Sequence, residues 1–358
     1  MTLLTVHVLI ALPSHNLNRD ESGAPKQITE GGVRRARLSS QSLKRAARVG
    51  FERTLAERER SLRTKVGVQV IVDRIAELRG GITDAQRAKL TAAVGKRVLS
   101  LTQDAPDEGA VSTKKDTMVW LSPGELEAAA RTFAAGGDAD VVGDATTDSL
   151  PIAAFGRMFA NQPGLNIPAA VSVGDATTTH AAVIELDWFT AVDDGETSHG
   201  GAGQMGYQMH TSGVYYRSFT IDRDQLARNL GGGLDDPSLT EALLDFVRHL
   251  TLALPSGKQA GSAASTLPAL ILAEEQTHRV AYDFQKPVAA DADGGFLQPS
   301  IQRLIAAADG AKAFAPSVFG ARLTSGTANV DGLNLHSFDE YLAFALSYLR
   351  GNVAMPKA

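Results

Sequence analysis

The sequence contains no cysteine, and this absence excludes disulfides, thiolate metal sites and a cysteine nucleophile. A chain without cysteine fits a reducing cytoplasm, where we expect the protein to work. No apolar run is long enough to span a bilayer. Residues 1–12 are apolar, but no basic residue precedes the run and no small-residue cleavage site follows it. We therefore interpret this run as a buried strand and not as a secretion signal.

Basic residues are in the minority, with 35 Lys and Arg against 40 Asp and Glu. A chain of this overall sign is not expected to bind polyanions indiscriminately. Six of the basic residues nevertheless fall between Gly31 and Arg48, in the segment GGVRRARLSSQSLKRAAR, which has no acidic residue. Guanidinium and ammonium groups neutralise phosphates, while hydroxyls and amides position them. A cationic block on an acidic background therefore points to a specific polyanion site.

The second half of this block predicts a helix over 39–60, with Ser39 or Ser40 as its N-cap. Helical spacing gives the segment two faces. One face is apolar or small: Leu43, Ala47, Gly50, Phe51 and Leu55. The other is polar: Gln41, Lys44, Arg45 and Arg48. An ordinary solvated face is the alternative, but such faces mix charges, as residues 57–60 do, and this one has no Glu.

The rest of the chain predicts an α+β fold. We expect strands at 3–12, 118–121, 151–159, 183–192, 207–221 and 267–274. We expect helices at 66–79, 83–100, 168–180, 222–230, 236–253, 299–308 and 337–350, and one that begins at Ser122 and ends at Gly136. Residues 13–38 are expected to form a long polar loop, which in a compact domain is usually functional. The helices within 66–148 indicate an inserted helical subdomain.

Residues 183–192 and 207–221 are expected to pair as a long β-hairpin with a tip rich in Gly, Asp and Ser. Alternation places Trp188 on one face, and Phe189 on the other among carboxylates. Phe189 is therefore expected to face solvent or a partner. An exposed Phe on a hairpin can wedge between bases or stack on one. The alternative is that Phe189 packs on the helical insertion.

Three other patterns have simpler explanations. The glycines of 201–206 match a dinucleotide-binding spacing, but a β-prone segment follows them instead of a helix. The acids of 187–194 can hold a hard cation, yet nothing nearby supplies an activated nucleophile, so turn and strand-end positions explain them. His180 and His210 have no ligand partner at a usable spacing, which favours packing or surface positions.

A resemblance to a known family begins at residue 7. Residues 7–48 resemble the signature of the CasC family, the backbone subunit of type I-E Cascade, in the run HVLIALPSHNLNRDESGAPKQITEGGVRRARLSSQSLKRAAR. Further matches follow in order along most of the chain: SLRT at 61–64, FGRM at 155–158, TTTH at 177–180, DWFTAVDD at 187–194, SGVYYR at 212–217 and GFLQPSI at 295–301. The middle region, 66–150, resembles the family only loosely.

The resemblance implies a hand-shaped α+β protein. Its palm, in residues 1–65, 151–182 and 220–358, has a modified ferredoxin-like fold of the RNA-recognition-motif type. Its fingers are a helical insertion at 66–150, and its thumb is a β-hairpin at 183–219. The aromatic motifs of RNA-recognition strands are absent from the palm, so we do not expect bases to stack on the sheet face.

The resemblance also implies a non-catalytic, RNA-binding role in antiviral defence, without a cofactor or metal. Copies stack head-to-tail as a filament along one CRISPR RNA, and each displaces a base at regular intervals so that the guide pairs with target DNA in short stretches. The implied partners are the CRISPR RNA, other copies of the chain, the target DNA reached through the guide, and the large, small, crRNA-capping and repeat-processing subunits of the ribonucleoprotein. No membrane partner is implied.

Position by position, the resemblance assigns three groups of residues. The palm contacts to RNA are Asn18, Arg19, Lys26, Arg34, Arg37, Ser39, Gln41, Lys44, Arg45 and Arg48, with Lys258 and Gln259 as weaker candidates in a Gly-flanked loop. Met158 and Phe189 match the apolar residues that bracket the displaced base; Met suits a wedge against any base because it is soft and unbranched. Lys114 and Lys115 are the nearest match to the family's target-DNA lysines.

Two other functions stay open. One is a metal-dependent endoribonuclease that uses Asp20 or the acids Asp187, Asp193 and Asp194, because distant type III relatives place a catalytic Asp in the corresponding loop. Here the neighbouring Arg19 and the type I-E signature indicate that Asp20 is structural. The other is a single-stranded RNA chaperone outside CRISPR.

Overall fold

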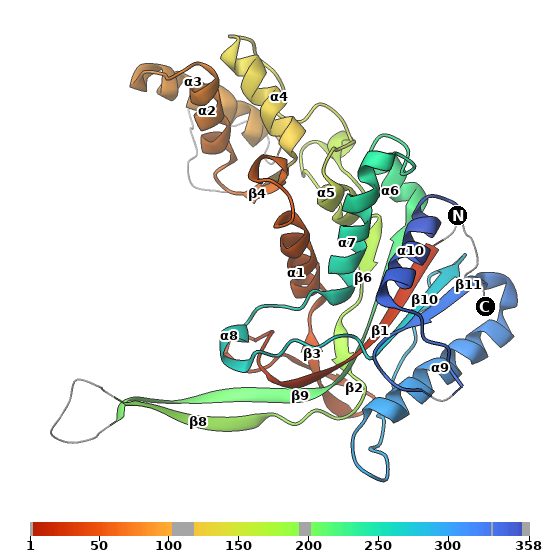
Figure 1. The fold of residues 1–358 in the computed structure, drawn as a ribbon. Coiled ribbons are helices and arrows are strands. Elements are labelled where there is room, and N and C mark those ends of the chain that lie inside the picture. The colour runs from red at the N-terminus through yellow and green to blue at the C-terminus, as the bar shows by residue number, and fades with distance from the viewer. Residues whose placement is uncertain (1–2, 102–117, 193–201, 331, 353–358) are drawn as a thin grey trace. The chain divides into compact units, whose positions relative to one another are not determined.

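The computed structural model describes residues 3–101, 118–192, 202–330 and 332–352 (Figure 1). The chain divides into two compact units, which are described separately. Unit 1 comprises Met1–Gly50, Val173–Thr220 and Pro237–Ala358. Unit 2 comprises Phe51–Ser172 and Ile221–Asp236, so it is wider than the helical insertion expected at 66–150.

Among the described residues, nine strands form one sheet, with the order β11-β10-β1-β9-β7-β3-β2 along its main path. Their bounds are β1 Leu3–His15, β2 Gln27–Glu30, β3 Val33–Leu38, β7 Ala176–Thr178, β9 Ala202–Asp222, β10 Leu270–Gln276 and β11 Phe319–Ser325. The other two strands, β6 (Val171–Val173) and β8 (Glu185–Val192), also pair with β9. The pairings β1–β10, β10–β11, β2–β3, β3–β7 and β7–β9 are antiparallel, which confirms the predicted α+β class.

Both faces of the central strand β1 are covered in unit 1, which explains its nearly continuous apolar run. Alternation sends Leu9 to one side, where it packs with residues of α9 (Leu297–Phe314). Ile10 points to the other side and packs with Leu43 of α1 (Ser40–Glu52). The other helices of unit 1 are α7 (Thr240–Leu252), α8 (Gln259–Ser262) and α10 (Phe338–Leu349), with 3-10 turns at Pro237–Leu239 and Pro316–Val318.

Unit 2 is mainly helical. Its helices are α2 Gly67–Leu78, α3 Asp84–Ser100, α4 Pro123–Ala134, α5 Leu150–Phe155 and α6 Arg223–Asn229, with 3-10 turns at Glu57–Glu59 and Pro163–Leu165 and a small sheet of β4 (Leu62–Thr64) and β5 (Val119–Leu121). The apolar faces of α2, α3 and α4 share one core. Ser122 and Glu125 form a capping box with Pro123 in the first turn, so α4 begins where its sequence predicts.

Three sequence predictions of secondary structure are wrong. The loop expected at 13–38 contains the β2–β3 hairpin, because Gly31 and Gly32 both adopt positive φ (61° and 78°) and form its two-residue turn. The strand expected at 151–159 is helix α5, which Ser149 caps ahead of Pro151. The helix expected at 168–180 is β6 and β7, since β-branched residues dominate 171–179.

Several element boundaries also differ from expectation. The helix expected to reach residue 60 ends at Glu52, so Leu55 lies outside its apolar face. The helix expected at 299–308 extends over Leu297–Phe314. Strand β11 was not expected, and the short helix α8 lies in the Gly-flanked loop of Lys258 and Gln259. None of the helices in the described residues combines the length and the apolar character needed to cross a bilayer.

His15, at the end of β1, gives the stability of the fold a pH dependence. Its ring is 1% exposed, and burial, followed by the nearby charge of His210, lowers its pKa from 6.5 to about 4. The folded state therefore keeps this ring neutral at pH values where the unfolded chain binds a proton. The free energy of unfolding should fall as pH drops from about 6.5 to about 4, by at most about 1.4 kcal/mol per pH unit from this group.

This contribution is measured by denaturant unfolding at pH 7, 6 and 5. The variant His15→Gln should lose less stability across this range than the parent. The exposed His278 provides a matched control, since His278→Gln should leave the parent's pH dependence unchanged. Equal slopes for the parent and His15→Gln would contradict the assignment.

Candidate nucleic-acid interface

The start of helix α1 is held by two residues that the sequence analysis assigns to RNA. The Asn18 side-chain oxygen accepts hydrogen bonds from Ser39 N at 2.8 Å and from Ser42 Oγ at 3.3 Å. Ser39 is buried, and its hydroxyl accepts from Ser42 N at 3.4 Å. Asn18 and Ser39 thus satisfy amide and hydroxyl donors in the first turn of α1, which fixes the direction in which the helix presents its polar face.

Asp175, between β6 and β7, is a member of this region that sequence reasoning missed. Its carboxylate accepts from Ser40 N at 2.7 Å and forms an ion pair with Arg37 Nε at 2.7 Å. An acid at the N-terminus of a helix is favourable because that end carries partial positive charge. Arg37 is therefore partly neutralised within the chain. No local sequence pattern links Asp175 to α1, since the contact depends on the pairing of β7 with β3.

The polar face of α1 is open to solvent at three of its four residues, Gln41, Lys44 and Arg45. Leu43, Ala47 and Phe51 are buried, while Gln41 and Arg45 are exposed and Lys44 is half-exposed. Within the described part of the chain, no hydrogen bond or ion pair engages the side chains of Lys44 and Arg45. The same holds for three predicted contacts that precede the helix in sequence: Arg19, Lys26 and Arg34. We call the residues Arg19, Lys26, Arg34, Lys44 and Arg45 the open cations.

Several arginines of unit 2 show the opposite arrangement. Arg74 lies 2.8 Å from Glu127, Arg87 lies 2.6 Å from Asp73, and Arg97 contacts both Asp138 and Asp140. Arg131 and Arg157 also pair with carboxylates. Because ion pairs are available in this acidic protein and the open cations lack them, an anion from outside the chain is the natural counter-charge for the open cations.

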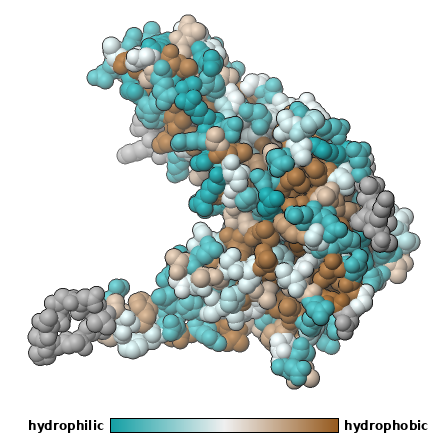
Figure 2. Space-filling view, viewed as in Figure 1, coloured by the Kyte–Doolittle hydropathy of each residue, from teal (hydrophilic) through white to brown (hydrophobic). Residues whose placement is uncertain are grey.

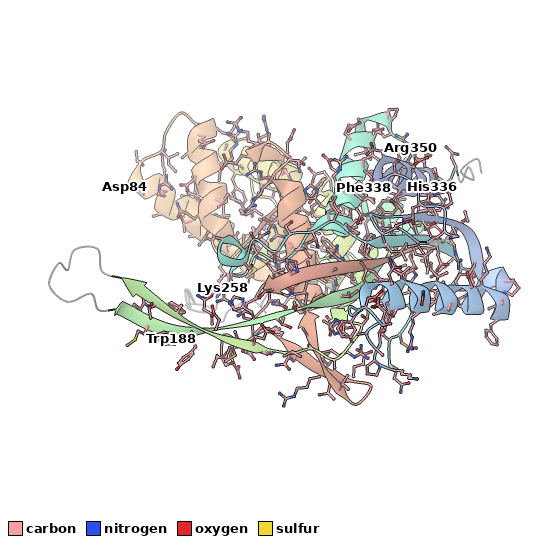
Figure 3. The ribbon with its side chains drawn as sticks, turned by 60° about the horizontal axis from the view of Figure 1, so that its bottom comes forward. Asp84, Trp188, Lys258, His336, Phe338 and Arg350 are labelled. Atoms are coloured by element: carbon pink, nitrogen blue, oxygen red, sulfur yellow. The ribbon has the colours of Figure 1, made fainter. Side chains whose placement is uncertain are left out.

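Further contacts gather parts of the predicted RNA set in unit 1. Lys26 N donates to Asn18 O at 2.9 Å, and Arg37 N donates to Lys26 O at 2.8 Å. Gly257 N donates to Leu17 O at 3.1 Å, which brings the loop of Lys258 and Gln259 to the same place. Lys258 has a left-handed backbone (φ 53°) and an exposed side chain (Figure 3).

The β8–β9 hairpin presents its aromatic residues differently from expectation. Phe189 is half-buried, because its ring covers Gly206 on the paired strand; a Cβ at Gly206 would lie 2.8 Å from Phe189 Cζ. The opposite face carries Trp188, which is 56% exposed (Figure 3). Its direct partner on β9 is Tyr207, which is 68% exposed. Figure 2 shows tan and brown side chains among hydrophilic ones on this hairpin.

Met158, in unit 2, is held outward by buried neighbours. Helix α5 ends at Phe155 and is followed by the C-cap residue Gly156, whose φ is 77°. Arg157 is buried, lies 2.7 Å from Glu125 and contacts the ring of Phe159, which is also buried. Met158 between them is 80% exposed. A large apolar side chain fixed in solvent by two anchored neighbours is suited to contact a partner.

Asp20, one of the acids weighed for metal-dependent cleavage, has a local role. Asp20 Oδ1 accepts hydrogen bonds from Ser22 N, Ser22 Oγ and Ala24 N, and these bonds, the Ser22 hydroxyl first, lower its pKa. Across the described residues, no three His, Asp or Glu side chains are grouped as metal ligands. Asp193, Asp194, Lys114 and Lys115 lie outside the described residues, so their assignments stay predictions.

His180 and its neighbour Thr179 pack against the segment GFLQPSI at 295–301. The His180 ring stacks on Phe296 with centroids 3.7 Å apart, and its Nε2 accepts from Val214 N at 3.1 Å. Thr179 Oγ1 lies 2.7 Å from Ser300 Oγ. These contacts confirm packing as the role of His180 and join the segments 177–180, 212–217 and 295–301, which are far apart in sequence.

Comparisons with known proteins agree over almost the whole chain. Residues 4–338 match a family model described as CT1975-like protein. A chain of a structure described as a CRISPR RNA-guided surveillance complex, pre-nicking, is similar with a TM-score of 0.77 and 25% sequence identity, over 98% of this chain and 100% of that one. A second, described as a CRISPR RNA-guided surveillance complex, has a TM-score of 0.69 over 98% and 99% of the two chains; its 21% identity shows the fold alone. A search of curated proteins finds no match.

Proposed function

The chain belongs to the CT1975-like protein family, and we propose that it is a non-catalytic backbone subunit of a type I-E CRISPR RNA-guided surveillance complex. The nearly complete match to a chain of such a complex supports this role. The motifs at 7–48, 61–64 and 155–158 support the type I-E assignment. The proposal places the protein in the cytoplasm, together with the guide RNA and the other subunits.

The observation that carries the proposal is the set of open cations. Lys44 and Arg45 project from one helix face, and Arg34 from the neighbouring hairpin, in a chain with more acidic than basic residues. Phosphate contacts of this kind hold a nucleic-acid backbone without reading its sequence. A subunit that grips any spacer sequence in this way leaves recognition of the target to base pairing by the guide.

The remaining assignments follow the same proposal. The palm comprises 1–65, 151–182 and 220–358, the fingers 66–150, and the thumb 183–219, and copies stack head-to-tail along the guide. Met158 and Phe189 of different copies bracket each displaced base. Arg37 and Arg48 complete the phosphate contacts on β3 and α1, whereas Asn18 and Ser39 contribute by fixing the start of α1.

The RNA that copurifies with the chain, expressed together with a CRISPR array and the other subunits, tests the function. Sequencing should recover guides flanked by repeat sequence. The double variant Lys44→Ala, Arg45→Ala should recover several-fold less guide from the same cells. A mixture of unrelated cellular RNAs from the parent would contradict the proposal and favour an RNA chaperone.

The same preparation separates binding from cleavage. Bound guide is incubated with Mg²⁺ or Mn²⁺ and should keep its length. Progressive shortening that the change Asp20→Ala abolishes would favour the endoribonuclease. Asp20→Ala alone should otherwise disturb only the local turn, since its carboxylate bonds to Ser22 and Ala24.

A further inference from the structure

The β2–β3 hairpin carries a buried arginine between two that reach the surface. Arg34 is exposed and Arg37 is half-exposed, but Arg35 is 0% exposed and is among the largest fully buried side chains of the described residues. Burial lowers the pKa of its guanidinium; the nearby charge of Glu30 acts against this shift, and the charge of Arg303 adds to it. A buried guanidinium is unfavourable unless the surrounding groups satisfy it, so its contacts need an explanation.

The contacts of Arg35 all go to backbone carbonyls. Its Nε donates to Glu30 O at 3.2 Å, in the hairpin itself. One terminal nitrogen donates to Thr178 O at 2.7 Å, at the end of β7. The other donates to Phe284 O and to Gln285 O, in the segment between β10 and α9. Within the described residues, no ion pair joins Arg35 to a carboxylate.

Gly31 gives independent evidence for the same junction. A Cβ at this position would lie 1.6 Å from Gln285 O, so only glycine lets the chain at 284–285 rest against the hairpin turn. The positive φ of Gly31 also fits the turn. Arg35 and Gly31 together fasten the hairpin to a segment about 250 residues later in the chain.

The fastened segment is also tied to the neighbouring strand. Val288 N donates to Thr179 O at 2.9 Å, next to the Thr178 carbonyl that Arg35 contacts, and Ala182 N donates to Arg34 O at 2.8 Å. The backbone of Arg34 is therefore held on one side by this bond and on the other by the pairing of Thr29 with Arg34. The planar fork of a guanidinium spans several acceptors at once, which the point charge of a lysine does not.

We propose that Arg35 is a positioning residue for the binding of the RNA backbone. It holds the β2–β3 hairpin against β7 and the segment at 284–285, and this fixes the place where Arg34 meets a phosphate. The inference rests on the proposed function, because it concerns how the open cation Arg34 is aimed. Arg35 itself does not touch RNA.

A double-mutant cycle tests this role with Arg35→Lys, which keeps the charge and much of the volume. In the parent, Arg34→Ala should lower affinity for single-stranded RNA about tenfold at low salt. In the Arg35→Lys background, the same change should lower it less than about twofold, because Arg34 is already displaced. Arg45→Ala, on α1, is the control and should lower affinity by the same factor in both backgrounds. If Arg35→Lys acted only by lowering the stability of the fold, it would change the effects of Arg34→Ala and Arg45→Ala alike.

Hydrogen exchange of the free protein supplies a readout that does not depend on RNA. The amides of Ala182 and Val288 should exchange faster in Arg35→Lys, while amides of α1 keep the parent's rates. If Arg34→Ala has the same effect in both backgrounds, or if these amides are unchanged, the positioning role is overturned. If the parent binds no RNA although exchange shows the predicted change, the proposed function has failed and the junction stands as purely structural.

Discussion

Replacing Lys44 and Arg45 together with alanine should lower the affinity for single-stranded RNA by about 10- to 100-fold at moderate salt. Both side chains project from α1 without a partner in the described residues. Their removal therefore deletes two positive charges from the proposed phosphate-binding surface and leaves the packing of the core almost unchanged. The slope of log affinity against log salt should become less steep by about 1.4, since each phosphate contact on a single strand contributes about 0.7. Titration of labelled RNA at several salt concentrations measures both quantities.

The matched control removes two exposed positive charges elsewhere in unit 1. Arg279 follows β10 and Lys312 lies on α9, and both are exposed. Arg279→Ala with Lys312→Ala changes the net charge equally, but it should alter affinity by less than about threefold and leave the salt slope as in the parent. Equal effects of the two double variants would mean that RNA responds to overall charge and not to this helix face. Thermal unfolding of each variant checks that the fold is kept.

The sequence was sufficient to predict the start and the two faces of α1, though not its end at Glu52, because local rules and tertiary contacts agree there. The spacing of Leu43, Ala47 and Phe51 predicts one buried stripe, and these residues are buried. The same spacing places Lys44 and Arg45 opposite that stripe, where the structure has them open to solvent. Helical periodicity determines which side chains share a face without reference to the rest of the fold.

The hairpin that precedes α1 could not be predicted by the same rules. Three arginines in the stretch 33–38 suggest a polar loop, but Arg35 points into the core and is satisfied by carbonyls that are distant in sequence. Burial of a charged side chain breaks the alternation from which strands are recognised. Asp175 could not be predicted as part of the site for a related reason, because its contact with the start of α1 exists only once β7 has paired with β3.

The change Met158→Ala should remove the periodic chemical reactivity of the bound guide while RNA affinity falls by less than about threefold. Met158 is 80% exposed between buried Arg157 and Phe159, so its thioether is presented at a fixed point. A soft, unbranched side chain can press against a base of any identity, and alanine is too short to do so. Affinity changes little because phosphate contacts carry most of it. Base-specific probing of the assembled complex measures the pattern.

Two further variants make this test specific. Met158→Leu keeps an apolar side chain of similar reach and should preserve the periodic reactivity. On the hairpin, Phe189→Leu is preferable to alanine, because the Phe189 ring covers Gly206 and its complete loss would loosen the β8–β9 pairing. Phe189→Leu should weaken the periodic signal without dissolving the hairpin, which circular dichroism of the variant verifies.

In the proposed arrangement, Met158 and Phe189 on the two sides of a displaced base come from different copies of the chain. If displacement needs both residues, Met158→Ala and Phe189→Leu combined should be no more severe than Met158→Ala alone, because one missing side of the bracket already lets the base return to the stack. A periodic pattern that persists in the combined variant would assign displacement to other residues, and the exposed pair Trp188 and Tyr207 would be the next to test. If the parent complex shows no periodic reactivity, base displacement by Met158 and Phe189 is not part of the function, and only the phosphate contacts of the open cations remain proposed.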